Sequence, residues 1–171
     1  LEDGAQQIMV IGHNKSLLKY LHDSIKHHDI APVGYYIGGM KEKDLKISET
    51  KKIIIATYQM AAEGLDIKSL NTLLMVTPKT DVCQAVGRIL RKKEGSHIIL
   101  DIVDIHPVFQ RQWKKRRAYY KKEKYTIQEI ELDNYLNEGE WVVTFKNGEK
   151  FDKRASKVAQ NKLLIGKCLI D

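Results

Sequence analysis

The sequence predicts an α/β fold: a parallel sheet flanked by helices, followed by a small helix-plus-hairpin extension at the C-terminal end. Two observations lead to this prediction. Five short runs are apolar nearly throughout, as is typical of strands covered on both faces, and segments of helical periodicity lie between them. Strands that alternate with helices at this spacing favour right-handed crossovers in a parallel sheet. With 171 residues, 43% of them hydrophobic, the chain is long enough to bury a core.

The five apolar runs are the expected strands. They cover residues 8–11, 33–37, 53–57, 72–76 and 97–103. The first helix has an apolar stripe over residues 17–25, and Asn14 or Ser16 is a suitable cap. A short helical turn follows Thr57 and ends at Gly64, where a glycine can adopt the left-handed conformation. A third helix is expected over residues 80–92.

After residue 104 the character of the sequence changes, so we expect one domain over residues 1–104 and an extension over residues 105–171. A basic helix is expected first, because residues 106–125 hold eight Lys and Arg against one Glu. Alternation of large apolar residues before Asn147-Gly148 then predicts a hairpin. A last helical segment over residues 155–164 closes the chain.

The large side chains of this extension allow two interpretations each. The cations from Lys114 to Arg117 could contact phosphates or mimic a nuclear signal, or they form a solvated face with Trp113 and Tyr120 packed inward. Trp141 and Phe145 could stack on bases, but alternation in a hairpin usually indicates a core position, and we favour the core.

The charge of the chain favours a polyanionic partner. The net charge is +7 and the sequence pI is about 9.3, which suits DNA or RNA. The apolar runs all fall short of the roughly 20 residues that cross a bilayer, so we expect no membrane partner. The only cysteines, Cys83 and Cys168, are far apart, and the six histidines do not form a metal cluster. We expect a reduced, intracellular protein without a structural metal.

The segment "CQAVGRILRKK" is a candidate anion site. After Asp81 as a cap, Gln84, Arg88 and Arg91 fall at i, i+4 and i+7 on one helical face. Two guanidinium groups and an amide on one face can receive an anion, and Gly87 removes a side chain beside them. A simpler interpretation is a capping box at Asp81 and Gln84, with basic residues that complement the helix dipole.

A second candidate site is "IIIATYQMAAEGLDI". Thr57 ends a buried strand, and Gly64 and Asp66 follow it. Open α/β sheets bind ligands at the carboxyl ends of their strands, so Thr57 could donate to a phosphate and Asp66 could accept from a ribose. An ordinary loop with a glycine helix stop explains the same residues.

Together and in this order, these segments resemble a known family. "ATYQMAAEGLDI" and "QAVGRILR" resemble motifs V and VI of superfamily 2 helicases, and "IMVIGHNKSLLKYL" resembles the region of motif IV. "GYYIGGMK" is similar to the tyrosine and paired glycines that come next in that family. The resemblance covers roughly residues 6–104 and implies the C-terminal RecA-like lobe. The tail "RRAYYKKEKY" further resembles helicases of the XPB-like and large-DNA-virus groups.

The resemblance implies roles in ATP hydrolysis. Arg91 would be the arginine finger, Arg88 its companion at the γ-phosphate, and Gln84 would help to organise the site. Asp66 would lie near the nucleotide ribose or the arginine pair, with Gly64 beside it in the same segment. The cofactors implied are ATP and Mg²⁺, with the Mg²⁺ ligands on the N-terminal lobe.

The resemblance also implies contacts to a DNA or RNA strand. Thr57 would contact its phosphate backbone, and Gly64 would permit close approach. The remaining expected strand contacts lie at strand ends and on the basic helix: His13, Asn14, Gly38, Gly39, Lys114 and Arg117.

The phosphate loop and acidic box of the first lobe do not occur in this sequence. We therefore expect a part of a longer ATPase, monomeric as an isolated domain and inactive alone, whose partner is the N-terminal lobe of the same polypeptide. The expected location is the nucleus or cytoplasm, or a viral factory if the protein is viral. The alternative is a non-catalytic nucleic-acid-binding or regulatory module. A Rossmann-type enzyme is less suitable, because Gly12 is the only glycine directly after the first strand.

Overall fold

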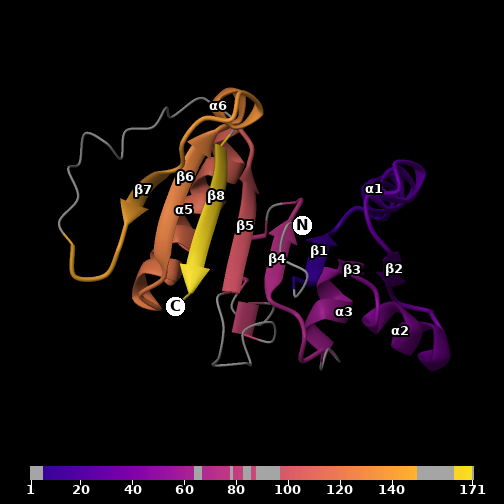
Figure 1. Ribbon diagram of the computed structural model, residues 1–171. Coiled ribbons are helices and arrows are strands. Elements are labelled where there is room, and N and C mark those ends of the chain that lie inside the picture. Colours follow the sequence, from indigo (N-terminus) through magenta and orange to yellow (C-terminus); the bar gives the residue numbers. More distant parts are fainter. Residues whose placement is uncertain are drawn as a thin grey trace. The chain divides into compact units, whose positions relative to one another are not determined.

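The computed structural model describes residues 6–63, 67–77, 79–82, 86–87, 97–149 and 164–170. The chain divides into two compact units, whose helices and strands are labelled in Figure 1. Unit 1 comprises residues 1–77 and 84–95, and unit 2 comprises residues 78–83 and 96–171. The strand at residues 97–103, expected in the first domain, belongs to unit 2. The domain boundary at residues 104/105 stays a prediction.

Parallel strands form the sheet of unit 1. They are β1 (Ile8–Gly12), β2 (Val33–Tyr36), β3 (Ile53–Thr57) and β4 (Thr72–Met75), in the order β2-β3-β1-β4. Val10 lies opposite Ile55 on one side and opposite Leu74 on the other. These strands confirm the first four expected from the sequence, and the parallel sheet with them.

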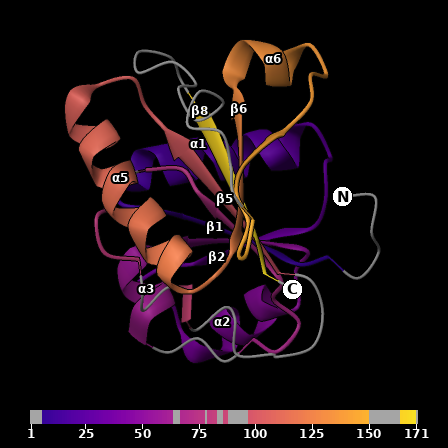
Figure 2. The same ribbon diagram turned by 90° about the vertical axis from the view of Figure 1, so that its left-hand side faces the viewer.

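The helices of unit 1 cover both faces of its sheet. Figure 2 shows α1 (Lys15–His27) on one face, and α2 (Glu42–Glu49) and α3 (Tyr58–Glu63) on the other. The sequence analysis missed α2, because its charged run contains only two large apolar residues and makes no stripe. Packing explains its position: a Cβ on Gly34 would lie 2.9 Å from Ser48 Oγ, so only a glycine in β2 lets α2 approach this closely.

The apolar stripe of α1 packs on the sheet as predicted. Leu18 is buried in one cluster with Val10 and Ile55, and Leu21 packs against the same cluster. At Gly12, a Cβ would lie 3.1 Å from the Val76 side chain and 3.2 Å from the Leu18 side chain, so the end of β1 is tightly packed where α1 comes close.

Unit 2 contains an antiparallel sheet. Its strands are β5 (His97–Val103), β6 (Thr126–Glu131), β7 (Val142–Phe145) and β8 (Leu164–Ile170), in the order β5-β8-β6-β7. Its helices are α5 (Pro107–Lys122) and α6 (Leu132–Leu136). The extension is therefore more strand-rich than the predicted helix and hairpin. Of the helix expected over 155–164, residues 155–163 lie outside the described part, and Leu164 begins β8.

The expected hairpin is described on one side of its turn. The turn at Asn147-Gly148 is present, and Gly148 has φ +83°. β7 enters this turn after pairing with β6, and residues 150–163 beyond it are outside the described part. Thr144 is the buried residue of β7, whereas Trp141 and Phe145 are only half-buried. Phe145 lies 5.3 Å from the Lys121 ammonium. The predicted core role of these two aromatic side chains is thus partial.

The basic helix α5 begins at a proline, which is favourable in the first turn because that position needs no N–H donor. Pro107 occupies the first turn, and His106 Nδ1 accepts a hydrogen bond from Val108 N at 3.3 Å. Trp113 and Tyr120 are buried, as expected, and face the sheet of unit 2. A Cβ on Gly166 of β8 would lie 2.7 Å from the Trp113 ring, so the ring rests directly on the backbone of β8.

A buried ion pair lies between α5 and β5. Arg116 donates from Nε to Asp101 Oδ2 at 2.6 Å and from Nη2 to Oδ1 at 2.8 Å. Both residues are about 1% exposed. The third donor, Nη1, reaches the Lys79 carbonyl at 2.8 Å, in the segment that follows β4. Burial raises the pKa of Asp101, and the Arg116 guanidinium opposes that rise.

Candidate functional site

Several predicted site residues meet at one edge of the unit 1 sheet. The register places Gly12, the last residue of β1, opposite Thr57, the last residue of β3. His13 and Asn14 follow Gly12, and Thr77 follows the end of β4. Because the strands are parallel, all of these residues lie at their carboxyl ends, where open α/β sheets bind ligands.

Thr77 accepts hydrogen bonds from two neighbouring segments of this edge. Its hydroxyl accepts a hydrogen bond from His13 N at 2.8 Å, and its carbonyl accepts one from the Tyr58 hydroxyl at 2.8 Å. The His13 and Tyr58 rings lie 4.5 Å apart between centroids. Tyr58 is only 3% exposed, so the contact fixes the ends of β1, β3 and β4 together. The sequence analysis missed both residues: Tyr58 stands in the segment "ATYQMAAEGLDI" but reads there as one of its helical residues, and Thr77 stands in no recognised motif.

Thr57 begins α3. Its hydroxyl oxygen lies 3.4 Å from Met60 N and accepts the capping hydrogen bond of that helix. The side chain is half-buried. Since a hydroxyl both donates and accepts, the cap leaves the O–H of Thr57 able to donate to an anion.

Asn14 is the cap of α1, which settles the choice between Asn14 and Ser16. Its Oδ1 accepts hydrogen bonds from Ser16 N at 2.9 Å and Leu17 N at 3.1 Å. The side chain is exposed. Within the described residues its NH₂ group has no partner, so it can donate outward at the same helix end.

The paired glycines form a turn after β2. Gly39 has φ +90°, a conformation that side chains rarely adopt. A Cβ on either Gly38 or Gly39 would meet nothing within 4 Å, so at Gly39 the backbone conformation, and not crowding, requires glycine. The turn leaves an open surface near the carboxyl end of β2.

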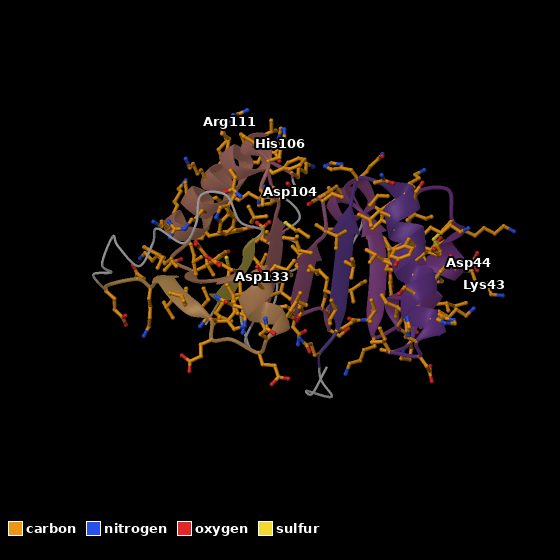
Figure 3. All side chains as sticks on the ribbon, turned by 90° about the horizontal axis from the view of Figure 1, so that it is seen from above. Lys43, Asp44, Asp104, His106, Arg111 and Asp133 are labelled. Atoms are coloured by element: carbon orange, nitrogen blue, oxygen red, sulfur yellow. The ribbon has the colours of Figure 1, made fainter. Side chains whose placement is uncertain are left out.

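The predicted residues of the basic helix have unlike surroundings. Lys114 is exposed. Arg117 donates from Nε to Glu129 Oε1 at 2.8 Å and from Nη2 to the Thr144 carbonyl at 3.3 Å, so its guanidinium connects α5 to β6 and β7. A phosphate contact by either residue stays a prediction. Exposed residues near the start of the helix, such as His106 and Arg111, project away from the ribbon in Figure 3.

The residues predicted to contact the nucleotide belong to other segments of the chain. Gln84, Arg88, Arg91, Gly64 and Asp66 lie outside the described residues, and their roles stay predictions.

Val86 and Gly87, within the same motif, are described and helical, and Val86 is fully buried. A Cβ on Gly87 would meet nothing within 4 Å, so no described residue crowds this glycine.

Neither a metal site nor a membrane-spanning helix occurs among the described residues. These residues hold no group of three His, Cys, Asp or Glu side chains able to bind a metal ion. Among them, too, the helices are all too short or too polar to cross a membrane.

Comparison with known sequences finds viral relatives, although no protein-family model matches the chain. The chain is 50% identical over 109 residues to "Putative ATP-dependent RNA helicase L396" of Acanthamoeba polyphaga mimivirus, which covers 62% of this chain and 21% of that protein. It is 28% identical over 102 residues to "Putative ATP-dependent RNA helicase QP509L" of African swine fever virus (isolate Pig/Kenya/KEN-50/1950), covering 57% and 20%. The matches thus span about a fifth of each helicase's length.

A shorter viral protein is also similar. The chain is 37% identical over 70 residues to the uncharacterized protein 108L of Invertebrate iridescent virus 3, which covers 40% of this chain and 67% of that protein.

Two solved structures share the fold at low sequence identity. The C-terminal part of the Fun30 ATPase domain matches with a TM-score of 0.55 and 12% identity, over 64% of this chain and 38% of that one. Domain 2 of the DEAD-box helicase Mss116p, bound to an RNA duplex, matches with a TM-score of 0.53 and 16% identity, over 69% and 49%. In sequence the chain is thus similar to viral proteins named as putative ATP-dependent RNA helicases, and in fold it is similar to the C-terminal part of the Fun30 ATPase domain and to domain 2 of Mss116p.

Proposed function

We propose that this chain is the second motor lobe of an ATP-dependent nucleic-acid helicase or translocase. The observation that carries the proposal is the common edge of the unit 1 sheet, where the ends of β1, β3 and β4 bring together His13, Thr57 and Thr77. Backbone and hydroxyl donors at such an edge suit the phosphates of a strand. The viral relatives named as RNA helicases support the same function, and they make RNA the first track to test.

The nucleotide side of the proposal rests on the segment "CQAVGRILRKK". Arg91 acts as the arginine finger, and Arg88 and Gln84 organise the γ-phosphate site beside it. Asp66 acts near the nucleotide ribose or the arginine pair, with Gly64 beside it in the same segment. Positive charge supplied from a second lobe stabilises the transition state only when the lobes close, which couples hydrolysis to closure.

The proposed partner is the N-terminal lobe of the same polypeptide. That lobe supplies the phosphate loop and the Mg²⁺ ligands, so this chain alone binds a strand without turning over ATP. The same proposal places the protein inside the cell, in the nucleus, the cytoplasm or a viral factory, and the isolated lobe as a monomer.

ATPase activity of the full-length parent tests this function. Turnover is measured with and without single- and double-stranded RNA and DNA, for the wild type and for Arg91→Ala. Since an arginine finger contributes about 10³–10⁵ in rate, Arg91→Ala should abolish measurable turnover while the affinity for nucleic acid stays nearly unchanged. Arg111→Ala, an exposed arginine on α5, is the matched control and should leave both properties intact.

Two results would contradict the proposal. Equal loss of turnover and of strand affinity in Arg91→Ala would move Arg91 from the nucleotide to the strand. A parent that binds nucleic acid but hydrolyses no ATP under any condition would favour the non-catalytic binding module.

A further inference from the structure

A hollow of about 280 Å³ opens on unit 1 between α1 and β2. Lys15, Leu18 and Lys19 of α1 line it on one side, and Tyr35 and Ile37 at the end of β2 line it on the other. Its lining is almost wholly apolar. Since ligand pockets measure about 300–1,000 Å³, this hollow suits a small planar group and not a large ligand.

Tyr35 is held in place before any ligand arrives. Its ring stacks on the His22 ring with centroids 4.0 Å apart and planes at 18°. The His22 ring is itself fixed by Asp23, whose carboxylate lies 3.1 Å from Nδ1. A rigid aromatic side chain loses little conformational freedom when a base packs on it, which favours binding.

Two lysines lie on the rim of the hollow, and the Asp23 carboxylate lies close enough to Tyr35 to raise the pKa of its hydroxyl, after the larger effect of burial. Lys15 and Lys19 are one helical turn apart and both exposed, and no carboxylate among the described residues pairs with either of them. The first turn of α1 contains no acidic residue. Two like charges at i and i+4 disfavour the helix by about 0.2–0.5 kcal/mol, and an anion bound between them would remove this repulsion.

The hollow adjoins the edge proposed for the strand. Lys15 directly follows Asn14, the cap of α1, and Ile37 directly precedes Gly38 of the open turn. A strand whose phosphates lie along this edge therefore passes the mouth of the hollow.

We propose that the hollow receives one unpaired base of the bound nucleic-acid strand. The base packs against Tyr35, Leu18 and Ile37, while Lys15 and Lys19 bind the phosphates on either side of it. This inference rests on the proposed function and deepens it. It adds a contact to a base at a surface that is otherwise proposed to contact only the sugar-phosphate backbone of the strand. An apolar lining reads no hydrogen-bond pattern, so the site tolerates any base, and it requires that base to be out of a duplex.

Binding of the 171-residue chain to a short, labelled single-stranded RNA tests the hollow. Base–aromatic stacking contributes about 1–3 kcal/mol, so Tyr35→Ala should weaken binding by about 5- to 150-fold, whereas Tyr35→Phe, which keeps the ring, should bind nearly as the wild type. An oligonucleotide of abasic sites with the same number of phosphates is the second probe. It should bind the wild type and Tyr35→Ala equally.

The lysines are tested by salt dependence. Loss of two phosphate contacts should lower the slope of log K against log salt by about 1.4 in Lys15→Gln/Lys19→Gln, because each contact to a single strand contributes about 0.7. Lys26→Gln/Lys43→Gln removes the same charge at exposed positions outside the hollow and should change the slope less. Lys43 lies at the outer end of α2 (Figure 3).

The outcomes distinguish failure of the base site from failure of the strand surface. In one outcome the wild type binds RNA while Tyr35→Ala weakens binding of the normal and the abasic probe equally, or weakens neither. Either result overturns the base site and leaves the strand surface standing. If the wild type binds no oligonucleotide at all, both the strand surface and the base site are overturned.

Discussion

Replacing Arg116 by Met should be among the most damaging single changes in unit 2. The guanidinium makes three hydrogen bonds, two of them to the Asp101 carboxylate, and Asp101 is itself about 1% exposed. Met fills much of the same space but leaves that carboxylate buried without its partner. Breaking a buried ion pair in this way costs about 3–5 kcal/mol, a large fraction of the 5–15 kcal/mol by which domains are stable.

The pH dependence of this loss has a definite sign. Burial raises the pKa of Asp101, and without Arg116 nothing of comparable strength opposes the rise. A group whose folded-state pKa is raised contributes stability that is present below its unfolded pKa and is lost as the pH rises through the folded value. The deficit of Arg116→Met relative to the wild type should therefore shrink as the pH is lowered from about 8 to 5.

Urea unfolding of the 171-residue chain measures the effect. In a Trp141→Phe background the fluorescence of Trp113, which lies against Gly166, reports on unit 2. Arg111→Met on the exposed side of α5 is the matched control and should stay within about 0.5 kcal/mol of the wild type.

A double variant shows whether the unpaired charge causes the loss. Replacing a whole buried ion pair by apolar residues is often neutral, so Asp101→Leu/Arg116→Met should recover most of the lost free energy. A loss below about 1 kcal/mol in the single variant, or no recovery in the double variant, would refute this reasoning.

Two further predictions concern the glycine under Trp113 and the exposed cations of α5. Gly166→Ala places a methyl group 2.7 Å from the Trp113 ring and should lower the free energy of unfolding in urea by about 1–3 kcal/mol. Gly38→Ala, whose methyl group meets nothing within 4 Å, should lower it much less. Equal losses in the two variants would exclude crowding as the cause. If the exposed pair Lys114 and Lys115 binds phosphates, Lys114→Gln/Lys115→Gln should lower the salt slope of single-stranded RNA binding by about 1.4, and an unchanged slope would leave these lysines a solvated face.

The sequence by itself determined the parallel sheet of unit 1 and the edge that carries the candidate site. Its strands are apolar runs that need no partner to be recognised, and Asn14 before the stripe of α1 is a local capping signal. His13 and Thr57 could be assigned to one edge because parallel strands must end on the same side.

Only the tertiary structure distinguished the buried cation of the basic helix from the exposed ones. Lys114 and Arg116 are both cations in one run, yet the first is exposed and the second is buried on Asp101. Sequence cannot separate them, because a buried cation is stable only opposite a carboxylate whose position is known. The strand β6 was hidden for the same reason: Glu129 faces inward to meet Arg117, so this strand lacks the simple alternation of apolar and polar residues.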